Sequence, residues 1–105
     1  MTTPDAEHDA STARLRVRLY VAGDGPNSTK ALANLRAVLA QLQRAPEEVE
    51  IVDVLQLPDR GLRDGVLVTP MLVRVDPAPE RRILGNLSDR TILLGLLSPE
   101  GLHRE

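Results

Sequence analysis

The residues best placed to support chemistry lie between positions 18 and 28, where a strand-like alternation meets a turn and then the start of a helix. A turn of this kind can hold two cysteines separated by two residues, whose thiolate attacks disulfides. Here the turn contains Asp24, Gly25, Pro26 and Asn27, and the chain has no cysteine. Thiol redox chemistry is therefore excluded, and we expect the turn to bind a partner rather than to catalyse a reaction.

Other catalytic and ligand-binding patterns are absent from the sequence. The two histidines, His8 and His103, lie near the two ends of the chain, and no cluster has metal-ligand spacing. There is no G-x-S-x-G nucleophile turn and no phosphate-binding G-x-x-x-x-G-K. The net charge of −2 offers no basic field for nucleic acid, and no apolar run approaches the ~20 residues of a membrane span. We therefore expect a cytoplasmic, non-enzymatic protein without cofactor, metal, nucleic acid or membrane.

Polar and aromatic residues at turns and strand edges are the candidates for contact with a protein partner. We expect six of them to do so: Tyr20, Asp24, Asn27, Arg74, Arg81 and Arg82. For the turn residues, the alternative is that they only shape the turn and cap the helix. Tyr20, the only aromatic residue, would either contact a partner or pack against a neighbouring helix. The three arginines flank a proline turn and suit acidic groups, unless they are simply solvated.

Hydrophobic periodicity defines the elements of the first half. A period of two predicts a strand over residues 15–22, and apolar residues at i, i+4, i+7 and i+11 predict a helix that ends at about residues 44–45, before Pro46. Asn27 or Ser28 is expected to cap the helix. The β-branched run over residues 49–55 predicts a second strand. Together they make a β-α-β unit with parallel strands.

The second half carries weaker local signals. Residues 59–64 are compatible with a short helix, 71–75 with a strand, 76–79 with a proline turn, and 81–84 with a strand that pairs back. Ser88 or Asp89 is expected to cap a last helix that reaches Leu97. Gly95 would cost that helix ~1 kcal/mol relative to alanine. Periodicity alone cannot assign the apolar run 92–97 to a helix or a strand.

The sum of these elements is an α/β fold of the order β-α-β-(α)-β-β-α, which is thioredoxin-like. The folded domain is expected over residues 14–99. The polar, acidic residues 1–13 are predicted to form a disordered tail, and residues 100–105 a short C-terminal tail.

A series of short motifs runs through residues 15 to 97 in a fixed order: Leu-Tyr-Val-Ala-Gly at 19–23, Pro-Asn-Ser at 26–28, Ile-Val-Asp-Val-Leu at 51–55, Thr-Pro at 69–70, Arg-Arg-Ile at 81–83 and Gly-x-Leu-Ser-Asp-Arg at 85–90. This set resembles the KaiB family of bacterial clock proteins. The stretch Arg63-Asp64-Gly65 departs from the family pattern, which is more acidic there and contains lysine.

The resemblance implies a regulatory protein that binds a KaiC-type hexameric ATPase ring in a circadian clock or a related timing or stress system. Members of the family change fold. The resting form, a homo-oligomer (dimer or tetramer), has the order β-α-β-β-α-α-β, and the partner-binding form has the thioredoxin-like order. The same unit occurs as the sensor domain of a KaiC-binding histidine kinase, and the length of 105 residues leads us to expect the stand-alone member.

The resemblance also implies a cis peptide at Thr69-Pro70. It assigns turn or fold-switch roles to seven residues: Gly23, Pro26, Thr69, Pro70, Gly85, Asp89 and Arg90. The alternative function is a redox-inactive thioredoxin-like adaptor for a different signalling or stress-response partner.

Overall fold

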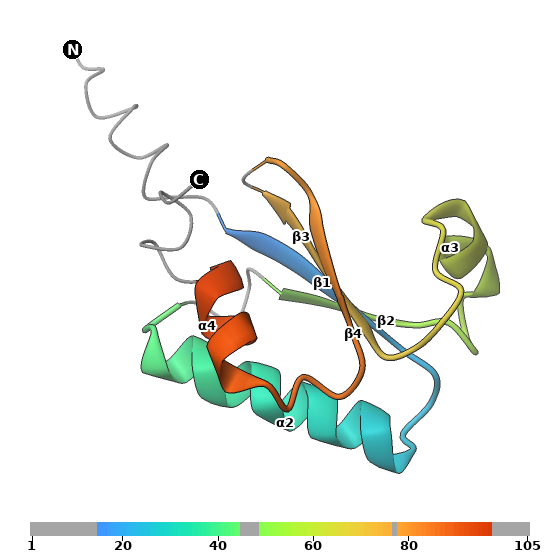
Figure 1. Ribbon diagram of the computed structural model, residues 1–105. Helices are drawn as coiled ribbons and strands as arrows, with labels where there is room; N and C mark the ends of the chain where they lie inside the picture. Colours follow the sequence, from blue (N-terminus) through green and yellow to red (C-terminus); the bar gives the residue numbers. More distant parts are fainter. Residues whose placement is uncertain (1–14, 45–48, 77, 98–105) are drawn as a thin grey trace.

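One four-stranded mixed sheet forms the centre of the fold, with helices on both of its faces (Figure 1). The computed structural model describes residues 15–44, 49–76 and 78–97. The strand order is β2-β1-β3-β4, with β1 (Arg16–Val21) parallel to β2 (Val49–Asp53) and antiparallel to β3 (Met71–Asp76). The last strand, β4 (Arg81–Leu84), is antiparallel to β3.

The helices are α2 (Pro26–Gln41), α3 (Pro58–Arg63) and α4 (Arg90–Leu97). Helices α2 and α4 cover one face of the sheet, and α3 lies against the other (Figure 1). This order confirms the predicted thioredoxin-like fold; the alternative β-α-β-β-α-α-β order is not the one observed. The expected tails 1–13 and 100–105, and both histidines, lie outside the described residues.

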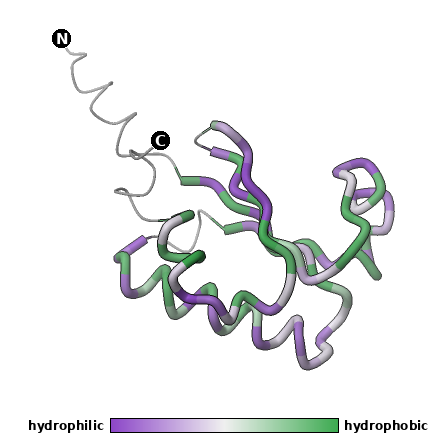
Figure 2. Tube along the Cα trace, viewed as in Figure 1, coloured by the Kyte–Doolittle hydropathy of each residue, from purple (hydrophilic) through white to green (hydrophobic). Residues whose placement is uncertain are grey.

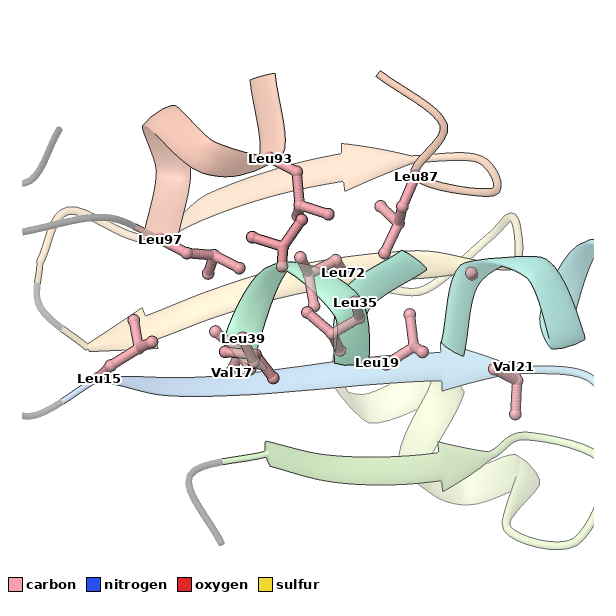
Figure 3. Close-up of a cluster of buried hydrophobic side chains, with 12 residues drawn as sticks. Leu15, Val17, Leu19, Val21, Leu35, Leu39, Leu72, Leu87, Leu93 and Leu97 are labelled. Carbon is pink, nitrogen blue, oxygen red and sulfur yellow. The ribbon is translucent and has the colours of Figure 1, made fainter. Parts of the chain in front are cut away.

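The larger core lies between the sheet and helices α2 and α4 (Figure 3). The alternation of β1 sends every second side chain into it, as a period of two requires. The core is almost purely aliphatic and is formed by Leu15, Val17, Leu19, Val21, Ala31, Leu35, Val38, Leu39, Leu72, Leu87, Leu93 and Leu97. The apolar residues of α2 that recur at helical spacing face this core, and β1 and β2 pair in parallel. The predicted β-α-β unit is therefore confirmed.

The start of α2 corrects the predicted cap. Gly25 is the N-cap residue, Pro26 is the first helical residue, and no side chain caps the helix. Proline suits the first position because its φ angle is already helical and its missing N–H would have no helical partner. Neither Asn27 nor Ser28 is therefore the cap, and the Ser28 hydroxyl instead accepts the N–H of Ala22 at 3.4 Å.

A smaller core lies on the opposite face of the sheet. It consists of Tyr20, Val52, Met71 and Val73, with Val54, Val66 and Val75 packed around it. Figure 2 shows that the segments just before and just after α3 are hydrophobic. These segments contain Val54 and Val66, which pack against this smaller core. The two faces of β1 are therefore both covered, one by α2 and α4 and the other by α3 and the residues on either side of it.

The second half follows the predicted elements to within two residues. The apolar run 92–97 is helical and its inward residues, Leu93 and Leu97, join the larger core. Of the two predicted caps, Asp89 is correct, since its carboxylate accepts the N–H of Ile92 at 3.2 Å. Among the described residues, no helix is both long and apolar enough to span a bilayer.

Candidate partner-docking site

The turn between β1 and α2 is joined to the turn after β2 by a single carboxylate. Oδ1 of Asp53 accepts the N–H of Gly23 at 3.0 Å and the N–H of Leu55 at 2.9 Å. Gly23 has φ +70°, and a Cβ at this position would lie 3.3 Å from the Leu55 side chain. The two loops therefore form one structured end of the sheet, with Asp24 and Asn27 exposed on it.

Large apolar side chains are exposed on and around α3, next to this end. Leu62 on the helix is 76% exposed and Leu67 after it is 88% exposed. We call the full set the α3 cap: Leu55, Leu57, Leu62, Leu67 and Val68, all from one stretch of fourteen residues. Clustered apolar exposure of this kind is typical of an interaction surface, whereas single exposed apolar residues are ordinary.

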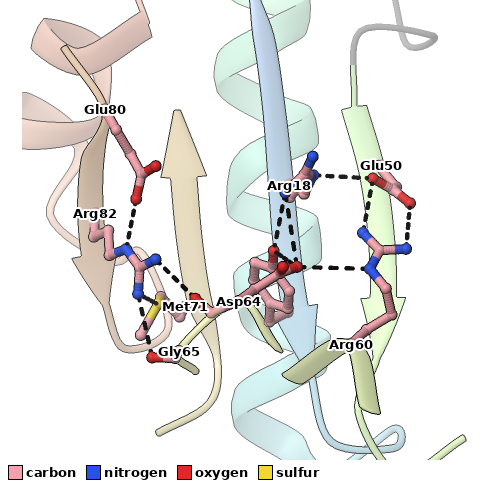
Figure 4. Close-up of polar contacts among 9 residues, drawn as sticks. Arg18, Glu50, Arg60, Asp64, Gly65, Met71, Glu80 and Arg82 are labelled. Carbon is pink, nitrogen blue, oxygen red and sulfur yellow. Dashed lines mark hydrogen bonds and ion pairs between the residues drawn. The ribbon is translucent and has the colours of Figure 1, made fainter. Parts of the chain in front are cut away.

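The position of α3 is determined largely by polar contacts. Tyr20 on β1 is 1% exposed, and its hydroxyl donates to Oδ2 of Asp64, immediately after α3, at 2.6 Å. Nη1 of Arg18 donates to the Tyr20 oxygen at 3.4 Å and lies 3.7 Å from Oδ2 of Asp64 (Figure 4). Tyr20 therefore packs beneath α3 and not on the surface, which is the second of its two predicted alternatives.

This arrangement shifts the ionisation of both partners. Burial raises the pKa of the Tyr20 hydroxyl, and its bond to Asp64 adds to the effect. The same bond lowers the pKa of Asp64, helped by the positive charges of Arg18 and Arg60. A neutral phenol facing a carboxylate is thus the stable pair.

Arg60 on α3 makes a second connection, to β2. Its Nη1 and Nη2 atoms donate to the two carboxylate oxygens of Glu50 at 3.1 and 3.3 Å, a bidentate pair. Its Nε atom lies 3.6 Å from Oδ2 of Asp64, and Nε of Arg18 lies 3.2 Å from Glu50. The bond from Arg60 is the main reason that the pKa of Glu50 is lowered.

The three arginines predicted around the proline turn are placed differently from one another. Arg74 is 6% exposed, and its Nη1 and Nη2 atoms donate to the carbonyls of Leu96 (3.1 Å) and Pro79 (2.9 Å). Arg82 donates to the carbonyls of Asp64 (2.9 Å) and Gly65 (3.3 Å) and pairs with Glu80 at 2.9 Å. Arg81 is exposed.

The expectation that Arg74 meets a partner therefore does not describe this fold. The physical reason is that β3 is an inner strand, so that its side chains point into the covered faces of the sheet. Neither predicted alternative, a partner contact or a solvated hairpin, applies to its guanidinium.

The predicted turn residues take up the following positions. The Thr69-Pro70 peptide is cis, and so is Ala78-Pro79. The Pro70 carbonyl accepts the N–H of Gly85, which has φ +101°. Arg90 is exposed and its Nη1 atom donates to Oε1 of Gln41 at 3.1 Å, joining α4 to α2.

Five charged residues of this region were not predicted as site residues: Arg18, Glu50, Asp53, Arg60 and Asp64. Asp53 ends β2 and precedes a turn, but in the sequence it lies inside the β-branched run 49–55, which hides its role as a loop-shaping carboxylate. Arg60 and Asp64 are four residues apart, the spacing of neighbours on a helix, whereas Arg18 and Glu50 become their neighbours only after the chain folds. The described residues contain no group of three or more histidine and acidic side chains that could hold a metal ion.

Comparison with known sequences identifies relatives over most of the chain. The KaiB domain profile matches residues 18–99. A circadian clock oscillator protein KaiB of Prochlorococcus marinus is 44% identical over 81 residues, which are 76% of this chain and 68% of the relative. The KaiB protein of a Picosynechococcus species is 44% identical over 92 residues, which are 85% of this chain and 88% of the relative.

Solved structures share the architecture. The N-terminal domain of Synechococcus elongatus SasA superposes with a TM-score of 0.67 at 20% identity, over 87% of this chain and 85% of that one. Thioredoxin of Fasciola hepatica superposes with a TM-score of 0.61 at 21% identity, over 90% and 88% of the two chains. At such identities the likeness shows the thioredoxin-like fold and nothing more.

Proposed function

This chain belongs to the KaiB family of circadian clock proteins, and from that membership we propose that it is a non-enzymatic regulator that binds a KaiC-type hexameric ATPase ring in the cytoplasm. The binding form is the thioredoxin-like fold described above. A resting homo-oligomer, dimer or tetramer, with a rearranged second half is the second state of the same proposal. A sequence without cysteine supports binding rather than redox catalysis as the purpose of the fold.

The observation that carries the proposal is the α3 cap. Its five apolar side chains lie at the end of the sheet that also carries the turn between β1 and α2. Burying such side chains on a partner contributes about 25 cal/mol per Å² of apolar area removed from water. We assign the α3 cap as the centre of the docking surface, with Asp24 and Asn27 beside it. Arg81, which is also exposed, is a further proposed contact.

Two states make the apparent affinity depend on their populations. If only a fraction of the chains has the thioredoxin-like fold, the measured Kd is the intrinsic Kd divided by that fraction. Complex formation is then limited by conversion and becomes slow.

The test is size-exclusion chromatography with light scattering, on the chain alone and after long incubation with the cognate KaiC-type ATPase. We expect a complex that forms slowly. Leu62→Glu is expected to weaken it by about tenfold or more, because a charge would be buried in the interface. Ile92→Glu is the matched control, since Ile92 is also exposed (54%) but lies on α4.

Absence of any complex under nucleotide conditions that favour binding would refute the proposal. Recovery from the source cell of a different partner, bound with the same sensitivity to Leu62→Glu, would instead establish the adaptor function.

A further inference from the structure

Helix α3 carries the proposed docking surface, but it has no large apolar side chain that is buried against the sheet. It has six residues, far fewer than the ~12–15 at which an isolated helix becomes even marginally stable. Gly61 is its only buried residue, and Leu62 points outward. The valines on either side of the helix, Val54 and Val66, pack against the smaller core. Apolar packing therefore holds the chain on either side of the helix, and the orientation of the helix between them depends on further contacts.

A group of polar residues supplies that fixation, and we call it the polar latch: Arg18, Tyr20, Glu50, Arg60 and Asp64 (Figure 4). Arg60 lies in α3, and Asp64 is the residue that caps its C-terminal end. The other three lie on β1 and β2. Both carboxylates face both guanidiniums, at 3.1 to 3.7 Å, and the hydroxyl of Tyr20 donates to Oδ2 of Asp64.

Asp64 joins three of these side chains. Its side chain is only 19% exposed and has Tyr20, Arg18 and Arg60 around it, whereas Glu50 pairs with the two arginines and not with Asp64. Its backbone carbonyl accepts Nη2 of Arg82 from β4 at 2.9 Å. Asp64 thus joins the end of α3 to strand β1 through its side chain and to strand β4 through its backbone.

We propose that Asp64 is the positioning residue of the docking surface: through the polar latch it holds α3, and with it the α3 cap, in the orientation that the partner recognises. This inference rests on the proposed function for its binding consequence, but its structural part stands independently. Without the charge of the Asp64 carboxylate, the buried Tyr20 hydroxyl has only a neutral oxygen to donate to, and the two guanidiniums share one counter-charge. The helix then opens from the sheet more often while the larger core remains intact.

The experiment compares Asp64→Asn, Tyr20→Phe and the double variant with the unaltered full-length chain. Both substitutions preserve side-chain volume and leave the larger core untouched. Asp76→Asn is the matched control, because it removes one carboxylate and one ion pair, that to Arg16 at 3.2 Å, on a distant part of the sheet. The structural readout is hydrogen exchange at Val66, whose N–H bonds to the Gly61 carbonyl at 2.8 Å, relative to the amides of β1.

We expect Asp64→Asn and Tyr20→Phe each to accelerate exchange at Val66 by about tenfold or more, with β1 unchanged. The effect of the double variant should be smaller than the sum of the two single effects, since Tyr20 and Asp64 share one hydrogen bond. The affinity for the KaiC-type ATPase should fall in each variant whose exchange at Val66 becomes faster. Asp76→Asn should change neither the exchange at Val66 nor the affinity.

Unchanged exchange at Val66 in Asp64→Asn would overturn the inference, even if the unaltered chain binds the ATPase. So would faster exchange at Val66 with unaltered ATPase affinity. If the unaltered chain binds no ATPase, the proposed function fails, and the exchange data alone decide whether the latch holds α3.

Discussion

Replacing Arg74 by methionine tests whether a buried guanidinium stabilises the second half of the fold. Arg74 donates to the carbonyl of Leu96, near the end of α4, and to the carbonyl of Pro79, in the turn before β4. A net contribution of about 1.5–3 kcal/mol is typical of a hydrogen bond to a charged group. Methionine also removes the desolvation cost of the buried charge, which offsets part of the loss. We therefore expect the free energy of unfolding to fall by about 1–3 kcal/mol.

The assay is urea unfolding followed by circular dichroism, with a thermal scan alongside. A loss of this size in a chain of 105 residues corresponds to a decrease of roughly 5–15 °C in Tm. Arg74→Lys should fall between methionine and the unaltered chain, since an ammonium keeps the charge but cannot reach both carbonyls with the same geometry.

The matched control is Arg81→Met, at the cross-strand partner of Arg74. Arg81 is exposed, so this change should leave stability within about 0.5 kcal/mol or raise it slightly, because like charges on facing strand positions repel. Equal stability of Arg74→Met and the unaltered chain would refute the reasoning, and so would a larger loss from Arg81→Met.

Three further predictions concern the latch, the core and the loops. The pKa values of Asp64 and Glu50 are lowered in the folded chain, so their contribution to stability is present above about pH 4.5 and disappears as the pH falls through those lowered values; in acid titrations, Asp64→Asn should flatten this loss, and an unchanged profile would contradict it. Leu93→Ala should cost about 2–5 kcal/mol in urea unfolding, because Leu93 is 1% exposed in the larger core; a loss under 1 kcal/mol would contradict that packing. Gly23→Ala should cost about 1–2 kcal/mol, because φ is +70° there and its Cβ would press on Leu55; stability equal to that of the unaltered chain would show that the loop relaxes freely.

The first half of the fold could be predicted from the sequence because burial determines it. The alternation of β1 and the helical spacing of α2 each place leucine and valine against the same core, and a pattern of that kind admits few alternatives. Two details of α2 were wrong. Its cap concerned a choice between neighbouring residues, which proline at the first helical position decided. Its end lies at Gln41 and not at residues 44–45, because Gln43 has φ +59° and leaves the helical conformation.

The candidate site could be predicted only in part. The turn residues Asp24 and Asn27 could be placed because turn chemistry is local, and both are exposed; their contact with a partner stays a prediction. Tyr20 and Arg74 were named as candidate partner contacts but are buried, because their environment depends on which strand is interior and on what covers it. The pairing of Glu50 with Arg60, or of Tyr20 with Asp64 at a separation of 44 residues, is a product of the tertiary fold.

Different elements of the chain are held by different kinds of interaction. Apolar burial in the larger core fixes β1, α2 and α4, and Arg74 also joins α4 to β3, whereas α3 depends on directional contacts to Arg18, Tyr20 and Glu50. Directional polar contacts between charged groups contribute modestly in net terms, because water competes for the same groups in any open state. A rearrangement that keeps β1 and α2 and re-pairs the second half would thus give up the polar contacts of α3 at modest cost, but it must bury Leu72, Leu87, Leu93 and Leu97 again in another packing. That is the energetic condition for two folds to lie within a few kcal/mol of each other, and the proposed conversion requires it.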